Sequence, residues 1–148
     1  MPYIQNKKIN FEYEVIERLE AGIELFGFEV KSLRGKLGSL EGSYVIVRGN
    51  EAFVVNAYIP PFQPNNVPKD YDPRRNRRLL ITKIEIQKLI GIEKKKGLTI
   101  VPVSVYNKGR KIKVEVAVVR GKKKYDKRED LKKRESDRDI QRTLKKEF

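Results

Sequence analysis

Hydrophobic and polar residues alternate most regularly in the segment 111–118. Apolar side chains occupy every second position there, at Ile112, Val114, Val116 and Val118. This period of two predicts a β-strand with one face in a core and the other in solvent. The segment 98–106 is also rich in strand-forming residues, and Gly109 between the two segments tolerates a tight turn. The two segments are therefore predicted to form a β-hairpin.

Further apolar segments predict that the fold is mainly β. Strands are expected at 44–48 and 52–59, separated by Gly49 and Asn50, and an earlier strand is expected within 12–28. All of these segments are short, which is typical of small barrels. The predicted fold class is a small closed antiparallel barrel with flanking short helices.

Two segments depart from the strand pattern. Five of the seven prolines lie between Pro60 and Pro73, which predicts a long irregular loop. Thr82 and Glu85 have the spacing of a capping box, and the apolar residues that follow recur with a helical period. These patterns predict a helix near 82–95, and a second short helix is expected around 29–34.

Charge and composition divide the chain into a body and a tail. The 148 residues include 34 Lys and Arg against 20 Asp and Glu, a formal net charge of +14, which favours a nucleic-acid partner. From 121 to 148, 12 Lys and Arg stand against 7 Asp and Glu, and apolar residues are sparse. Such a segment buries too little apolar surface to fold alone. We predict one folded domain over 1–120 and a basic C-terminal tail over 121–148.

The composition also excludes several classes of protein. The chain contains no Cys, His or Trp. Disulfides, Cys/His zinc sites, thiol nucleophiles and imidazole bases are therefore excluded. No apolar run approaches the roughly 20 residues that cross a bilayer, and residues 1–3 do not begin a signal-peptide pattern. We expect a cytoplasmic protein with no membrane partner, no metal and no cofactor.

The acidic and glycine-rich segments give little support to an enzyme. Four glutamates, at positions 12, 14, 17 and 20, cluster near the N-terminus, but each lies beside strand-forming residues and fits a solvent-facing strand position. The glycine-rich segment 34–43 lacks the Walker A spacing and favours turns. An RNA-processing enzyme would need a metal-binding carboxylate cluster, which the sequence does not offer.

Two basic clusters are candidates for RNA contact. The segment 74–78 holds four arginines, at Arg74, Arg75, Arg77 and Arg78. They fit either phosphate clamps or a solvated charge run. The second cluster spans 121–128, where Tyr125 among cations fits either stacking on a nucleobase or a linker with an incidental aromatic.

A set of short motifs, in a specific order and spacing, resembles the small protein B family over about residues 6–142. The motifs are NKK at 6–8, EAGI at 20–23, EVKSLR at 29–34, SYV at 43–45, DPR at 72–74, RLL at 78–80, VP at 101–102, GKK at 121–123 and DKR at 126–128. The resemblance implies an OB-like barrel and no active site. It also implies an adaptor for trans-translation that binds transfer-messenger RNA (tmRNA).

The resemblance further implies partners. Members bind the tRNA-like domain of alanyl-tmRNA and replace the missing codon–anticodon pairing on stalled ribosomes, where the tail enters the vacant messenger channel. Translation then resumes on tmRNA and the nascent chain is tagged for degradation. The implied partners are tmRNA, the 70S ribosome with its decoding centre, and elongation factor Tu, with the protein itself a monomer. The competing hypothesis is a ribosomal or RNA-chaperone OB protein without a rescue role.

Matching positions imply two sets of site residues. The tmRNA-binding set is Asn6, Glu20, Lys31, Arg34, Arg77, Arg78 and Leu80. Glu20 would accept hydrogen bonds from RNA or orient a neighbouring arginine, whereas Leu80 would contact RNA or lie buried in a strand. The decoding-centre set is Gly121, Lys122, Lys123, Tyr125, Asp126, Lys127 and Arg128. The further tail cations Lys132, Lys133, Arg134 and Arg138 are expected to gain phosphate contacts in the messenger channel.

The tail has a physical reason to change conformation. Many relatives carry His at the position of Tyr125, so stacking is retained here but imidazole chemistry is not. Glu129 with Lys133 favours a helix, whereas Arg134 with Arg138 repels in a free helix. RNA phosphates would neutralise that repulsion. We predict coil in solution and helix on the ribosome.

Overall fold

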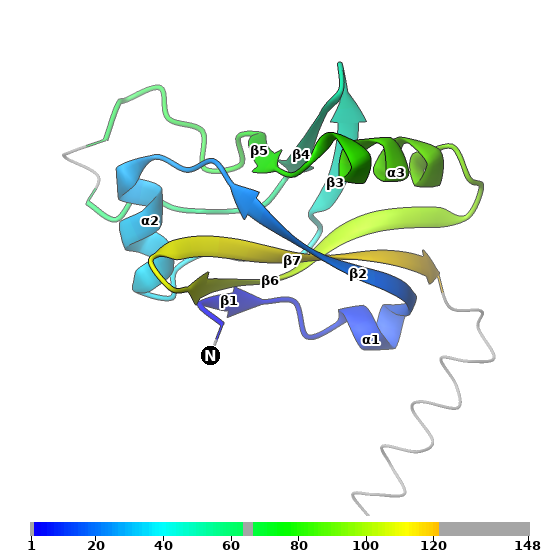
Figure 1. Ribbon diagram of the computed structural model, residues 1–148. Helices are drawn as coiled ribbons and strands as arrows, with labels where there is room; N and C mark the ends of the chain where they lie inside the picture. The colour runs from blue at the N-terminus through cyan, green and yellow to red at the C-terminus, as the bar shows by residue number, and fades with distance from the viewer. Residues whose placement is uncertain (1, 64–66, 122–148) are drawn as a thin grey trace, which may run out of the picture.

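Three long strands form the centre of the molecule. In the computed structural model, which describes residues 2–63 and 67–121, they are β2 (Tyr13–Ile23), β6 (Leu98–Lys108) and β7 (Lys111–Gly121). β7 lies between the other two, and all three are antiparallel (Figure 1). The β6–β7 pairing confirms the predicted hairpin, and Gly109 adopts a φ of 64° in its turn.

Shorter strands extend this sheet on both sides. β1 (Ile4–Gln5) pairs with β6, and β5 (Arg77–Leu80) pairs with β2. β4 (Glu51–Val55) and β3 (Tyr44–Arg48) follow, giving the order β1-β6-β7-β2-β5-β4-β3. Gly49 and Asn50, with φ of 58° and 61°, make the tight turn between β3 and β4. Positive φ at both positions matches the twist of the two strands.

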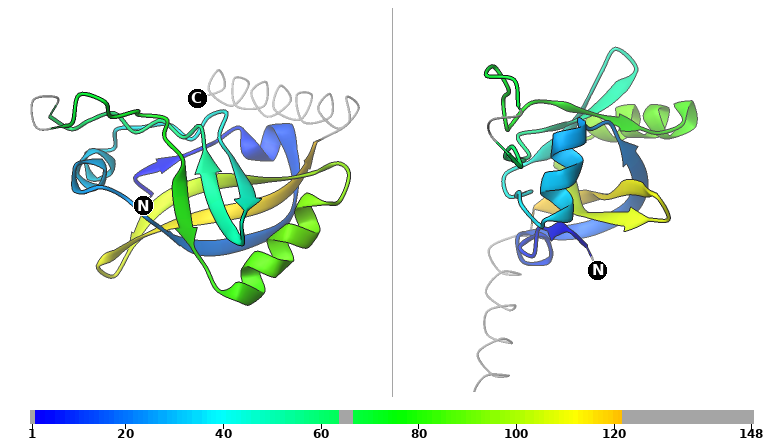
Figure 2. Two further views of the ribbon diagram at one scale, coloured as in Figure 1. Left: turned by 90° about the horizontal axis from the view of Figure 1, so that it is seen from above. Right: turned by 90° about the vertical axis from the view of Figure 1, so that its left-hand side faces the viewer.

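The prediction of a closed barrel is wrong. Within the described residues the hydrogen-bonded ladder has two free ends, β1 and β3, although curvature brings β3 near β6 (Figure 2). Helix α3 (Lys83–Glu93) packs against both β3 and β6. Its Glu93 carboxylate accepts a hydrogen bond of 3.1 Å from the Val47 backbone N–H on the edge strand. A helix side chain thus satisfies an edge group that barrel closure would have paired.

Apolar side chains are buried on both faces of β7. The main core fills the interior of the curved sheet and includes Val114, Val116 and Val118. A second cluster on the other face includes Ala117 and Val119 and is covered by α1 (Ile9–Glu12). The expectation of a solvated outer face for this strand is therefore wrong at its C-terminal half. The single-turn helix α1 covers the outer face of β7 here, and the alternation of apolar residues did not indicate this contact.

The remaining helices and strands agree only in part with the predictions from the sequence. α3 begins after Thr82, whose hydroxyl accepts from the Glu85 backbone N–H at 3.2 Å, and this confirms the capping box. α2 (Gly27–Arg34) begins two residues before the predicted segment. The strand expected at 52–59 ends at Val55, and β2, β6 and β7 have 11 residues each, so the strands are not all short. β1, α1 and β5 were not predicted.

Candidate nucleic-acid interface

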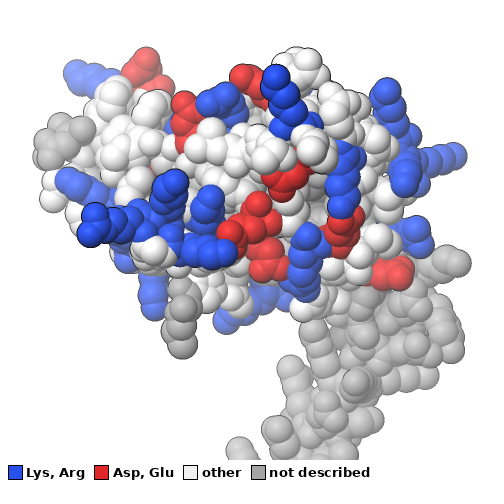
Figure 3. Space-filling view, viewed as in Figure 1, with Lys and Arg blue, Asp and Glu red and all other residues white. Residues whose placement is uncertain are grey.

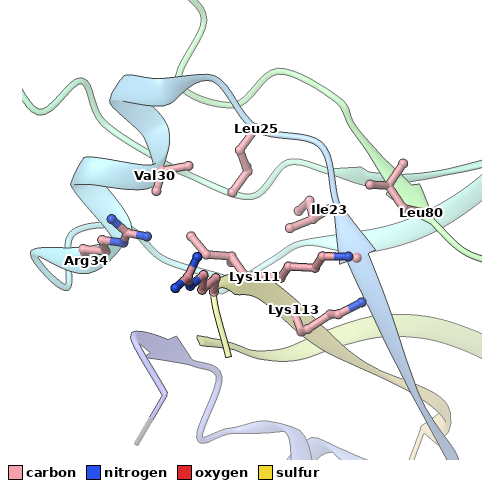
Figure 4. A pocket seen from close by; sticks show the side chains of 10 residues that line it. Ile23, Leu25, Val30, Arg34, Leu80, Lys111 and Lys113 are labelled. Carbon is pink, nitrogen blue, oxygen red and sulfur yellow. The ribbon is translucent and has the colours of Figure 1, made fainter. Parts of the chain in front are cut away.

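A groove with an apolar floor and a cationic rim opens where α2 faces the β6–β7 hairpin. Its volume is about 400 Å³. The floor and sides are Gly22, Ile23, Leu25, Val30, Leu80 and Ile112. The rim carries Arg34, Arg110, Lys111 and Lys113, and Figure 4 shows Arg34 on α2 and Lys111 and Lys113 on the hairpin. We call this site the cationic groove.

A second groove continues from the first. Its volume is about 650 Å³, and it shares Gly22, Leu80 and Lys113 with the cationic groove. Its charged lining is mixed and comprises Glu20, Glu51, Arg78, Lys83, Glu85 and Lys113. We call it the mixed-charge groove. Figure 3 shows the same division on one face, with Lys and Arg gathered toward α2 and the hairpin turn and acidic side chains nearer the centre.

Leu80 lines both grooves, at the point where β2 and β5 approach each other closely. Gly22 is paired with Leu80 in register, and a Cβ at position 22 would lie 3.1 Å from the Leu80 Cβ. Any larger residue would displace the leucine. Leu80 is 49% exposed, so the alternative of a buried strand residue is wrong and the side chain is available to a ligand.

Lys31 and Arg34 are both exposed on α2, one turn apart. Arg34 reaches the cationic groove, whereas Lys31 lines a separate hollow with Phe28 and Phe62. Cations in the last turn of a helix also interact favourably with its C-terminal carbonyl groups.

Arg77 is buried, so the prediction that it contacts RNA phosphates is wrong. Its side chain and that of Glu29 on α2 are both 0% exposed and form an ion pair. Nε donates to Glu29 at 2.8 Å, and the four remaining N–H groups donate to the carbonyl oxygens of Ala57, Arg75 and Pro73 and to the Tyr71 hydroxyl. All five guanidinium donors are thus used inside the protein.

Glu29 is the centre of this buried network. It accepts hydrogen bonds from Arg75, Arg77, the Tyr71 hydroxyl and the Phe26 backbone N–H. Burial alone would raise the pKa of Glu29, but the hydrogen bond from Arg75, that from Phe26 and the charge of Arg77 outweigh it and lower the pKa. Burial and Glu29 raise the pKa of Tyr71 to about 12. We call these four side chains, Glu29, Tyr71, Arg75 and Arg77, the Glu29 network.

The other two arginines of the 74–78 cluster are held near the surface. Arg74 lies over the Tyr58 ring at 5.2 Å and donates to the Asn56 carbonyl oxygen. Arg78 donates to Glu24 at 2.8 Å and to Glu51 at 3.3 Å, with its side chain 42% exposed. The predicted cluster is therefore neither a uniform phosphate clamp nor a solvated run, and within it only Arg78 lines either of the two grooves.

Glu20 lies at the edge of the mixed-charge groove with both carboxylate oxygens engaged. The Tyr106 hydroxyl donates to one oxygen, and the Lys108 ammonium donates to the other at 3.1 Å. These hydrogen bonds, with Tyr106 contributing most, lower the pKa of Glu20. Burial and Glu20 raise the pKa of Tyr106 to about 12. The other β2 glutamates, Glu14 and Glu17, are exposed, as a solvent-facing strand predicts.

The remaining predicted residues lie elsewhere or outside the described residues. Asn6, which follows β1, accepts a hydrogen bond from the Lys8 backbone N–H and lines a small hollow separate from both grooves. Gly121 ends β7. The predicted tail sites from Lys122 to Arg138 lie outside the described residues.

Sequence analysis missed three rim residues, Arg110, Lys111 and Lys113. A signal was present, because the alternation of the hairpin puts Lys111 and Lys113 on its polar face. What the pattern did not indicate is that α2 faces this surface and supplies Arg34 to the same groove. In the described residues no group of three or more Asp and Glu is arranged to hold a metal ion, and no helix is long and apolar enough to span a membrane.

Comparison with known proteins gives one consistent result. A family model described as SmpB protein matches residues 3–146. The SsrA-binding protein of Microcystis aeruginosa is 46% identical over 140 residues, covering 95% of this chain and 91% of that protein. The SsrA-binding protein of Acetivibrio thermocellus is 45% identical over 144 residues, covering 97% and 93%.

A solved structure shares the fold as well. A chain from "tmRNA-SmpB: a journey to the center of the bacterial ribosome" has a TM-score of 0.68 and 38% identity, and the match covers 86% of this chain and 92% of that one. Together with the family match over nearly the whole sequence, this likeness establishes that the chain belongs to the SmpB protein family.

Proposed function

We propose that this protein is an RNA-binding adaptor of trans-translation, which binds the tRNA-like domain of tmRNA and brings it to stalled ribosomes. Two relatives are named SsrA-binding protein, and one solved structure with a similar fold is described as "tmRNA-SmpB: a journey to the center of the bacterial ribosome". In this proposal tmRNA and the 70S ribosome are the partners, with elongation factor Tu delivering alanyl-tmRNA. The protein acts in the cytoplasm as a monomer and catalyses no reaction.

The observation that carries the proposal is the cationic groove. Four cations surround an apolar floor that includes the exposed Leu80. Cations at a rim attract backbone phosphates, whereas an apolar floor offers contact to sugars and bases. The proposed RNA surface comprises the groove residues Arg34, Arg78, Leu80, Arg110, Lys111 and Lys113, with Glu20 at the edge of the mixed-charge groove. Lys31 and Asn6, which line separate hollows, are proposed as further contacts outside the two grooves. Arg77 supports this surface from inside.

The fold is consistent with this role. A strongly curved antiparallel sheet with unpaired ends corresponds to a partly open OB-like barrel, a fold that presents a strand surface to nucleic acids. α3 fills the gap between its edges. The first turn of α3 also lines the mixed-charge groove, so the same helix supports the open side and part of the proposed RNA surface.

In this proposal the tail acts on the ribosome. We assign the decoding centre and messenger channel to Gly121 and the tail residues predicted from the sequence. Their cations gain phosphate neighbours only where RNA surrounds them. Binding there must offset the entropy of ordering this segment, whose composition predicts that it buries too little apolar surface to fold alone.

The first experiment measures RNA preference. The full-length chain is titrated with a transcript of a tmRNA tRNA-like domain, with ordinary tRNA and with unstructured RNA, at about 0.15 M salt, where non-specific binding weakens. We expect clear preference for the tRNA-like domain. Equal affinity for all three RNAs would favour the competing function, a general RNA-binding protein without a rescue role.

The second experiment separates body from tail. A chain ending at Gly121 keeps every described strand and both grooves, so it should bind the tRNA-like domain nearly as well as the full chain. Its activity in a reconstituted assay that tags stalled nascent chains should be lost. Normal tagging by the shortened chain would refute the role of the tail in the messenger channel.

A further inference from the structure

Three side chains from two non-adjacent strands meet on the outer face of the sheet. Glu20 lies on β2, whereas Tyr106 and Lys108 lie on β6, and β7 separates the two strands. The Tyr106 hydroxyl and the Lys108 ammonium both reach over β7 to the Glu20 carboxylate. A contact that spans a whole strand requires a specific arrangement of the side chains between.

The register explains how this arrangement is possible. Tyr106 is paired with Lys113, and Lys113 is paired with Gly22, so the row that begins with Tyr106 ends at a residue without a side chain. In the next row, Glu115 of β7 is paired with Glu20 and forms its ion pair with Arg18. Glu115 is thus engaged, and Glu20 is the acid that receives the two β6 donors.

The hydrogen bonds assign different roles to the three groups. Each Glu20 oxygen already accepts from this protein, whereas the Lys108 ammonium has three donors and gives one of them to Glu20. The Lys108 side chain is 66% exposed, so its remaining donors are accessible to a ligand next to Glu20, which lines the mixed-charge groove. Tyr106 holds the carboxylate, and the carboxylate holds the ammonium.

We propose that Glu20 is a positioning residue, which binds RNA through Lys108 rather than by its own contact. A free lysine loses side-chain entropy when it binds a phosphate, and a lysine already held by a carboxylate loses less. Lys108 is thereby a phosphate-binding residue that the family motifs in this sequence do not include. This inference rests on the proposed RNA-binding function of the two grooves.

The test is a double-mutant cycle on the full-length chain, with a transcript of a tmRNA tRNA-like domain as the probe. Glu20→Gln and Lys108→Met should each weaken binding by roughly 3- to 10-fold, and the double variant should be no weaker than Lys108→Met. Tyr106→Phe should show a smaller loss, since it frees the carboxylate but keeps Lys108. Glu17→Gln, which removes another β2 glutamate paired with a lysine, Lys88, is the matched control and should bind normally.

The salt dependence provides the readout that a merely structural role would not move. Lys108→Met should reduce the slope of log affinity against log salt by up to about one unit. Glu20→Gln should reduce it similarly, although it removes a negative charge, because Lys108 no longer makes its phosphate contact.

Two outcomes would overturn the proposal. Additive losses with an unchanged slope in Glu20→Gln would mean that Glu20 contacts RNA directly. Unchanged or tighter binding by Glu20→Gln would mean that it positions nothing. The cycle uses one RNA, so it is independent of the preference among RNAs that tests the proposed function.

Discussion

The 74–78 arginine cluster and the β6–β7 hairpin are both basic, yet two arginines of the cluster are drawn into the protein and the hairpin cations are exposed to a groove. Arg75 and Arg77 turn inward to Glu29, whereas Arg110, Lys111 and Lys113 line an open groove. The difference lies in the partners. The buried Glu29 carboxylate on α2 pairs with the arginines, whereas among the described residues no acid lines the cationic groove. Positive charge in a sequence therefore locates an RNA surface only after the internal acids have been assigned.

The largest effect expected from this comparison is on stability. Arg77→Met leaves the Glu29 carboxylate buried with a main partner removed, which should lower the free energy of unfolding by about 3–5 kcal/mol. Glu24→Gln removes an exposed partner of Arg78 instead and should cost less than about 1 kcal/mol. Urea denaturation of both variants measures the contrast. Equal, small losses would mean that the Glu29 network contributes little.

Acid should act on the same network. Because the folded pKa of Glu29 is lowered below the value of 4.5 expected in the unfolded chain, its contribution is fully present above that pH and is lost as the pH falls through the folded pKa. Thermal unfolding between about pH 2 and 6 should therefore show a steeper loss of stability for the wild type than for Glu29→Gln. Parallel pH profiles would contradict this assignment.

Smaller effects are expected at the cationic groove, and they should appear in binding rather than folding. Single replacements Arg34→Met, Arg110→Met, Lys111→Met and Lys113→Met should each lower the salt slope for the tRNA-like domain by up to about one unit. Their free energies of unfolding should stay within about 0.5 kcal/mol of the wild type, since these side chains lie at the surface. Lys96→Met, on an exposed residue outside both grooves, is the control. An unchanged slope would remove the residue tested from the interface.

The last contrast is between two neighbouring leucines of β5. Leu79 is 3% exposed and its neighbour Leu80 is 49% exposed, so the pair separates core from interface within one strand. Leu79→Ala should destabilise the protein by about 2–5 kcal/mol. Leu80→Ala should cost less than about 1 kcal/mol of stability but weaken RNA binding without changing the salt slope. A large loss of stability in Leu80→Ala would instead assign that side chain to the core.

Several elements were predictable because their signals are local. The alternation at 112–118 and Gly109 predict the hairpin, and Thr82 with Glu85 predicts the start of α3. β5 was not predicted, because its RRLL sequence resembles a charge cluster and it forms only by pairing with Gly22 on β2 and with β4. α1 is a single turn that is stabilised by covering Ala117 and Val119, so it has no local signal of its own.

The candidate site was predictable by residue type more than by position. The predicted tmRNA-binding set included Arg34 and Leu80, which line the grooves, but it also included Arg77, which is fully buried. The sequence alone determined the basic charge, the absence of Cys and His chemistry, the hairpin and the family, because these depend on composition and on neighbours along the chain. Only the tertiary structure decided which cations are exposed. Glu29 meets Arg77 across 48 residues of sequence and Glu20 meets Lys108 across 88, and a pairing over such distances depends on how the strands are ordered.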